Sequence, residues 1–320
     1  IITFLSALAC LAGAVQAQSI SVQDAIGQSA ESFVRNHLMG EGVWVFNVTY
    51  NNASNISSPA IGTFNTNGYA GIGMQEGIIM SNGHINAGAG PQVSPNDFHL
   101  DDYYVDHEME GLVPWNTSAR ICGSSTLDFD FVALTDEISF RYCFASYEYV
   151  MYVCTEYADM FGFLVTGPDP LTGLEETHNI AVIPNSVSLD YPDGIPVSIN
   201  TVNSGQPGLW AIYMGGLEEG CYYDASGFYI DNNHLVQIPG TNNFIVDSSS
   251  VDGMGIGFPG FTSKMSATMQ VTPCVMYHMH ISVVNVGDNY VESGVFLEGG
   301  SFSAPQAAIG LTRTTIDTIP

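Results

Sequence analysis

A chain of 320 residues, 46% of them hydrophobic, can bury a large core, so the composition excludes a disordered protein. Its 32 Asp and Glu residues face only five Lys and Arg residues, and the net charge of −27 repels nucleic acid and anionic membrane surfaces. Such self-repulsion destabilises a compact state unless counter-ions bind, and calcium is a hard cation that suits clustered carboxylates.

The first 17 residues are typical of a secretory signal. They form an apolar run that ends in small residues, with Val15 and Ala17 at positions −3 and −1 of a cleavage after Ala17. The run lacks the basic n-region of a signal peptide and is short for a transmembrane helix, so we interpret it as an incomplete signal peptide. We expect a secreted, cell-surface-associated protein whose mature domain does not insert into a membrane.

One substantial helix is predicted at the start of the mature chain. Residues 21–38 place Val22, Ile26 and Phe33 on one helical face, with Ser21 as a candidate N-cap. This helix opens a single domain that we place at residues 18–303. Residues 304–320 are interpreted as a linker or a truncated C-terminal segment.

From residue 43 onward the pattern changes to alternation with period two and to short apolar runs. Gly, Pro, Asn and Asp clusters separate these runs at the intervals typical of a sandwich. No helix alternates with them, which disfavours a parallel βαβ architecture. The sequence therefore predicts an all-β fold, a two-sheet antiparallel β-sandwich or jelly roll with one N-terminal helix and long acidic loops.

Acidic residues beside Gly and Asn turns, on a chain with few charges, predict an oxygen-ligand calcium site at loop ends. Five of the candidate ligands are spread over residues 148–292, and two belong to an acidic loop over residues 88–110. They are Glu148, Asp159, Asp252, Asp288 and Glu292, with Asp101 and Asp102 from the loop. The alternative is ordinary turn chemistry, in which Asp and Asn side chains satisfy local backbone N–H groups.

Possible catalytic pairs have simpler explanations. Asp128 and Asp130 share one face of a strand, as a glycosidase pair would, but they alternate with apolar residues like a solvent-facing strand. His278 and His280 also share a strand face, without a third zinc ligand at a recognisable spacing. The chain has no G-x-S-x-G elbow and no phosphate-binding loop. We predict that the protein is not an enzyme, and a secreted hydrolase is the least favoured alternative.

Aromatic residues in the irregular region 204–243 indicate a contact surface. Tyr222, Tyr223, Phe228 and Tyr229 are candidates for stacking on a glycan or contacting a protein.

Disulfides are also expected in an exported chain. The mature part keeps Cys122, Cys143, Cys154, Cys221 and Cys274, which allow at most two bridges. Cys154 can pair with Cys143, Cys221 or Cys274, and the connectivity is left open.

Several collinear motifs carry a family resemblance over residues 20–303. They lie at residues 34–38, 42–50, 61–64, 77–83, 127–146, 159–163, 179–184, 196–203 and 293–298, and the longest reads LDFDFVALTDEISFRYCFAS. Through them the chain resembles the choice-of-anchor L domain family, exported domains of surface and secreted proteins in Bacteroidota-type bacteria. The resemblance implies a surface or secreted role, often beside adhesion modules, without an established catalytic activity.

These observations favour a non-catalytic surface module that binds a glycan or another surface protein, with calcium ordering its acidic loops. An alternative is a structural subunit of a surface layer or filament that contacts copies of itself. Exposed strand edges would favour that alternative.

Overall fold

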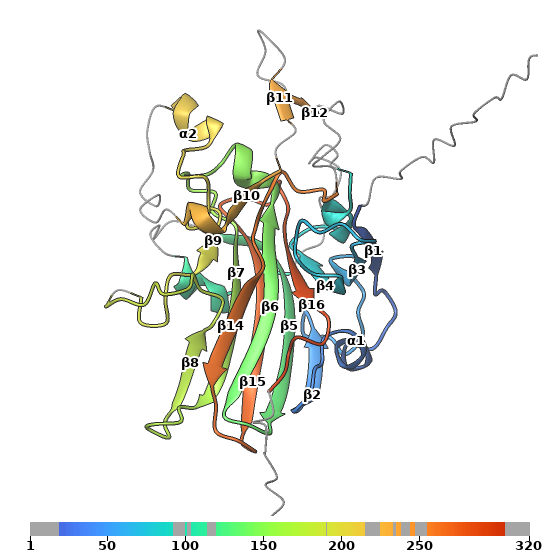
Figure 1. Cartoon of the computed structure of the whole chain (residues 1–320), viewed down its shortest axis with the longest axis vertical. Helices are drawn as coiled ribbons and strands as arrows, with labels where there is room; N and C mark the ends of the chain where they lie inside the picture. The colour runs from blue at the N-terminus through green and yellow to red at the C-terminus, as the bar shows by residue number, and fades with distance from the viewer. Residues whose placement is uncertain are drawn as a thin grey trace, which may run out of the picture.

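Two antiparallel sheets stack face to face in the computed structural model of the chain (Figure 1). The structure describes residues 19–91, 100, 104–113, 120–189, 191–214, 225–232, 235–237, 244–246 and 255–304. Over these residues it confirms the predicted β-sandwich with few helices. Within the same residues, no helix combines the length and the apolar character that a bilayer span requires.

The larger sheet has eight strands, in the order β1-β3-β4-β16-β6-β13-β10, and β14 also pairs with β6. Their bounds are β1 Ser21–Asp24, β3 Ile61–Asn65, β4 Glu76–Ser81, β16 Ser293–Glu298, β6 Glu137–Ser146, β13 Gly260–Thr262, β10 Tyr229–Asp231 and β14 Met265–Gln270.

The second sheet has six strands, in the order β2-β5-β15-β7-β8, with β9 also paired to β7. Their bounds are β2 Val43–Tyr50, β5 Ile121–Ala133, β15 Met276–Val286, β7 Met160–Pro168, β8 Glu175–Asn179 and β9 Val197–Ser198. The short strands β11 Leu235–Gln237 and β12 Phe244–Val246 pair only with each other. The helices are α1 Ala30–His37 and α2 Leu209–Met214, with short 3₁₀ turns at η1 Ile85–Gly88, η3 Glu108–Leu112, η4 Tyr147–Val150 and η5 Ser226–Phe228.

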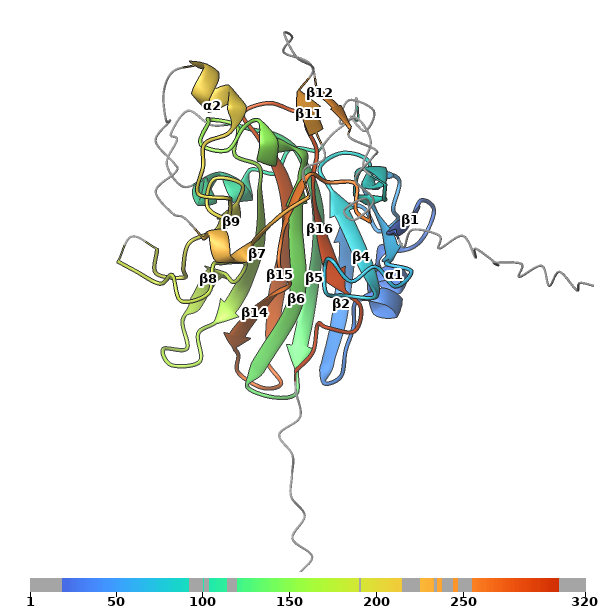
Figure 2. The same ribbon diagram turned by 45° about the horizontal axis from the view of Figure 1, so that its top comes forward.

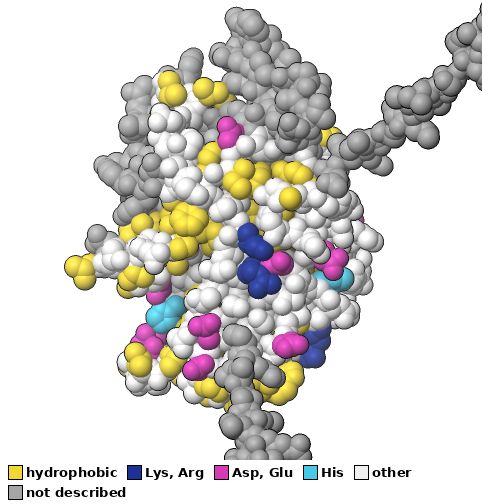
Figure 3. Space-filling model, in the orientation of Figure 1, with side chains coloured by type: hydrophobic (Ala, Val, Ile, Leu, Met, Phe, Trp, Pro, Cys, Tyr) yellow, Lys and Arg dark blue, Asp and Glu magenta, His cyan; other side chains and the backbone are white. Residues whose placement is uncertain are grey.

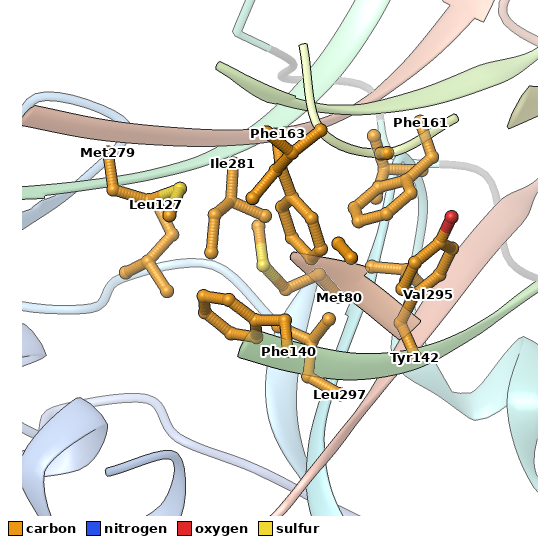
Figure 4. Close-up of a cluster of buried hydrophobic side chains, with 14 of the residues drawn as sticks. Met80, Leu127, Phe140, Tyr142, Phe161, Phe163, Met279, Ile281, Val295 and Leu297 are labelled. Carbon is orange, nitrogen blue, oxygen red and sulfur yellow. The ribbon is translucent and has the colours of Figure 1, made fainter. Parts of the chain in front are cut away.

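The core between the sheets follows from the alternation of the strands. On β5, Leu127, Phe129 and Phe131 point inward and are fully buried, while Asp128 and Asp130 point to the outer face. Aromatic rings together with aliphatic and methionine side chains fill the space between the layers (Figure 4). Phe140 of β6 is central, because its ring stacks on Phe163 at 4.8 Å and on Phe302 at 4.4 Å between centroids.

The predicted helix over residues 21–38 is wrong in its first half. Residues Ser21–Asp24 form β1, which pairs with β3 in the register Ser21↔Asn65, and α1 begins only at Ala30. Gly27 adopts a positive φ of 85°, which turns the chain between the two elements. Ile26, assigned by the helical pattern to the buried face, is 52% exposed. The hydrogen bonds of the sheet therefore override the local helical pattern.

The two sides of the sandwich differ. Helix α1 buries Phe33 and Val34 beside β2, and so covers one side. On the opposite side, β8 and β14 are edge strands among the described strands of their sheets. Both views show them on this side, away from α1 (Figures 1 and 2).

Candidate functional site

Three of the predicted calcium ligands meet at one end of the sandwich. Glu148 lies in η4 directly after β6, Asp159 precedes β7, and Glu292 precedes β16, so strands of both sheets bring them there. The three residues, called here the carboxylate cluster, are only 1%, 1% and 2% exposed. Glutamate and aspartate are rarely buried so deeply without a charged partner.

Asp159 is the best satisfied member of this cluster. Its Oδ1 accepts a hydrogen bond from the Val286 backbone N–H at 3.0 Å. Its Oδ2 accepts bonds from Asn82 Nδ2 at 2.9 Å and Ser293 Oγ at 2.8 Å. Asp159 thereby ties β4 and β16 of one sheet to β15 of the other. Burial nevertheless raises the pKa of Asp159 to about 7.

Glu148 and Glu292 are less well satisfied. Glu148 Oε2 accepts a bond from the Asp159 backbone N–H at 3.1 Å, and burial together with the Asp159 charge raises the pKa of Glu148 well above its usual range. Both carboxyl oxygens of Glu292 are buried and lack any hydrogen-bond partner among the described residues. Burial raises the pKa of Glu292 to about 8. The charge of Asp288, on the loop after β15, also raises the pKa values of Glu148 and Asp159.

Among the described residues, no Lys or Arg side chain forms an ion pair with a member of this cluster. A proton or a metal cation therefore has to balance the buried charge. The three carboxylates do not bring one oxygen each within 4.8 Å of the others. A shared cation would have to draw them closer together.

A second polar group covers the outer face of the six-stranded sheet. Asp106, His280, Asp128, His278 and Asp130 form a row, called here the His–Asp row. His280 bonds Asp106 through Nε2 at 2.8 Å and Asp128 through Nδ1 at 2.6 Å. His278 Nδ1 lies 2.9 Å from Asp130 Oδ1.

The register of β5 and β15 explains this row, because it pairs His278 with Asp130 and His280 with Asp128. Burial alone lowers the pKa of His280, but the bonds to Asp106 and Asp128 and their charges outweigh it and raise the pKa to about 10. His280 is therefore an imidazolium at neutral pH.

Segment 104–113 packs over this sheet and buries the Asp106–His280 end of the row. The backbone N–H of Asp106 donates to Ser124 Oγ at 2.9 Å, and Met109 is fully buried against the sheet. Gly162 permits the close approach, since a Cβ there would lie 2.7 Å from Met109 Cε. Part of the predicted acidic loop is therefore a packed cover over the sheet.

The open side of the sandwich carries a hollow of about 820 Å³ between the β8 region and β14. This edge hollow is lined by Leu171, Ile183, Val187 and Met269, with Asp169, His178 and Asp193 as polar groups. Leu171 and Val187 are largely exposed. Hydrophobic side chains gather on this side, next to acidic residues and a histidine (Figure 3). Such surfaces are typical of interaction sites.

Several predicted residues lie outside the described part of the chain, namely Asp101, Asp102, Asp252, Tyr222, Tyr223 and Cys221. Phe228 and Tyr229 are described, and both are partly buried against the main core. The Tyr229 ring packs on Tyr149 with centroids 4.9 Å apart. Tyr229 therefore contributes at least part of its ring to packing.

The disulfide candidates are corrected in three cases. Cys122, Cys143 and Cys274 are free thiols, so the bridges of Cys154 to Cys143 and of Cys154 to Cys274 are both wrong. Cys143 is fully buried in β6, where its Sγ lies 3.0 Å from the Thr262 carbonyl oxygen, whereas Cys274 is exposed in the turn before β15. Cys154 is disulfide-bonded, and its partner is not among the described residues.

Comparison with known proteins gives one match. The family model of the choice-of-anchor L domain matches residues 21–303. No curated protein and no solved structure matches the chain.

Proposed function

The chain belongs to the choice-of-anchor L domain family, surface-associated modules of secreted proteins, and we propose that this member recognises a surface glycan or protein without catalysing a reaction. We further propose that calcium stabilises the acidic end of the sandwich. The first proposal rests on the edge hollow and the second on the carboxylate cluster.

The edge hollow supports recognition because it combines volume, apolar surface and polar groups in one place. Its volume of about 820 Å³ lies in the range of small-ligand sites. Leu171 and Val187 expose apolar surface, while the partly exposed carboxylate of Asp169 offers a hydrogen-bond acceptor to sugar hydroxyls or peptide N–H groups. In contrast, Asp128 and Asp130 are occupied by histidine partners, so they offer no open pair of carboxylates for glycoside hydrolysis.

Binding to glycan arrays and to surface-protein extracts tests the recognition proposal. The double variant Leu171→Ser and Val187→Ser removes apolar surface at the hollow, and Ile26→Ser is the matched control, an exposed residue near α1. We expect a ligand whose binding is lost in the double variant and kept in the control. A ligand that binds all three proteins equally would contradict recognition at the hollow.

Calcium is proposed because Glu292 buries two oxygens without partners beside two more carboxylates. A divalent cation would supply the missing partner for Glu292 and reduce the repulsion among the acids. We expect calcium to raise the Tm above its value in EDTA, and magnesium to do so less, since magnesium tolerates irregular oxygen sites poorly.

Glu292→Gln should abolish most of this calcium response, whereas Glu175→Gln, an exposed residue of β8, should leave it intact. An equal response of both variants would place calcium elsewhere. If calcium leaves the wild-type Tm unchanged, the proposed calcium site is wrong, and protonation balances the charge.

A second candidate function is self-assembly into a surface layer or filament. It is favoured by β8 and β14. Each has a neighbouring strand on one side only among the described strands, so the backbone groups on its other side can pair with another chain. Sedimentation velocity over a hundredfold concentration range tests it. A mass that stays monomeric throughout would exclude this role for the domain alone.

A further inference from the structure

Three side chains of different chemistry converge at the β7–β8 hairpin. Asp169, Glu176 and His178 each offer a ligand atom, and these atoms all lie within 4.8 Å of one another. Glu176 and His178 are two residues apart on β8 and therefore share one face of the strand, while Asp169 directly follows β7. Because the group contains an imidazole nitrogen, it differs in chemistry from a purely acidic surface cluster.

A fourth residue fixes the orientation of the histidine. His178 Nδ1 lies 2.7 Å from Asp193 Oδ1, and Asp193 Oδ2 accepts a bond from the Asn179 backbone N–H at 3.1 Å. With Nδ1 bonded to Asp193, the second ring nitrogen, Nε2, faces Glu176 Oε2 at 3.4 Å. A carboxylate that holds one nitrogen of a histidine while the other faces further ligands is the usual arrangement around protein-bound zinc.

The backbone holds the remaining ligand in place. Asp169 Oδ1 accepts bonds from the N–H groups of Leu171 at 3.0 Å and Thr172 at 2.7 Å, and neither of these backbone bonds uses Oδ2. Asp169, Glu176 and His178 are all partly exposed, so an ion can enter from solvent. Asp169 and His178 also line the edge hollow, which leaves room for a water or another donor at the ion.

We propose that Asp169, Glu176 and His178 form a zinc site with one nitrogen and two carboxylate ligands, with Asp193 as the residue that orients His178. Three protein ligands and an open fourth position match the tetrahedral preference of Zn²⁺. The imidazole ligand selects against calcium and magnesium, which take oxygen ligands. This site is separate from the carboxylate cluster and does not depend on the proposed recognition function.

Calorimetric titration of the metal-free domain with Zn²⁺ tests the proposal, and Co²⁺ provides a second readout through its visible absorption. We expect one saturable site in the wild type. His178→Gln and Glu176→Gln should abolish it, and Asp193→Asn should weaken the affinity by roughly 10- to 100-fold, because loss of an orienting carboxylate has that effect. Glu175→Gln is the control, since Glu175 neighbours Glu176 on the opposite face of β8.

Circular dichroism and the calcium response of each variant serve as controls for folding. A folded His178→Gln variant that binds Zn²⁺ as tightly as the wild type would overturn the assignment, as would a wild type without a saturable site. The loss of zinc binding with an intact calcium response would separate the two metal sites. A failed calcium response with intact zinc binding would refute only the calcium proposal.

Discussion

The substitution His280→Gln tests how strongly the His–Asp row holds segment 104–113 to the six-stranded sheet. His280 is 5% exposed and is the one side chain among the described residues that bonds both Asp106 and Asp128. Removing it leaves two carboxylates facing each other in a largely buried site. Loss of one partner from a buried pair costs about 3–5 kcal/mol. The rise in the pKa of His280 from 6.5 to about 10 corresponds to about 5 kcal/mol, which agrees with this cost in order of magnitude.

Urea unfolding followed by far-ultraviolet circular dichroism measures this loss. For a domain of this size, about 3–5 kcal/mol lowers the Tm by roughly 10 °C. The control is His107→Gln, because His107 pairs with Glu110 on the exposed surface, where such a pair contributes at most about 1 kcal/mol. A His280→Gln protein within about 1 kcal/mol of the wild type would refute the reasoning.

The same histidine predicts a pH dependence. Because its pKa is raised in the folded state, its stabilisation is fully present below about pH 6.5 and is lost as the pH rises through about 10. The wild type should therefore lose stability between pH 8 and 10, and His280→Gln should lose much less. Parallel curves for the two proteins over this range would show that His280 is not charged in the fold.

The carboxylate cluster predicts that, without calcium, the free energy of unfolding falls as the pH rises from about 4.5 to 8. The reason is that Asp159 and Glu292 have raised pKa values of about 7 and 8 in the folded state. Urea titrations in EDTA and in calcium should show this slope only in EDTA. Gly162→Ala forces a methyl group against Met109 and should lower the free energy of unfolding in urea by about 1–3 kcal/mol. Hydrogen exchange in segment 104–113 should become faster, and unchanged exchange there would contradict this packing. Phe140→Ala empties the centre of the core and should cost about 3–5 kcal/mol by the same measurement, and a loss below about 1 kcal/mol would contradict its central position.

The fold class could be predicted from the sequence because strand alternation is a local pattern. The alternation of Leu127, Phe129 and Phe131 with two aspartates identifies the inner and outer faces of β5 without knowledge of its neighbours. The first helix shows the limit of such patterns. Its apolar spacing continued back to Val22, but pairing with β3 satisfied the backbone of residues 21–24 as a strand, and that partner lies about forty residues away.

The candidate sites depended on contacts that no local pattern contains. The sequence identified Glu148, Asp159 and Glu292 separately as turn acids, yet only the meeting of the two sheets made them one buried cluster. Their burial and the two unpartnered oxygens of Glu292 are tertiary properties, because they depend on what packs around each side chain.

The aspartates of β5 and the histidines of β15 show the same division. The sequence placed each pair on one strand face, and that was right for both. The register between the strands, which sets His280 opposite Asp128, comes from the pairing of segments about 150 residues apart. Glu176 and His178 likewise gain Asp193 as a neighbour only after the chain folds back beside β8. Side-chain type and strand face are local properties of the chain, whereas burial, register and charge neutralisation are decided by the tertiary structure.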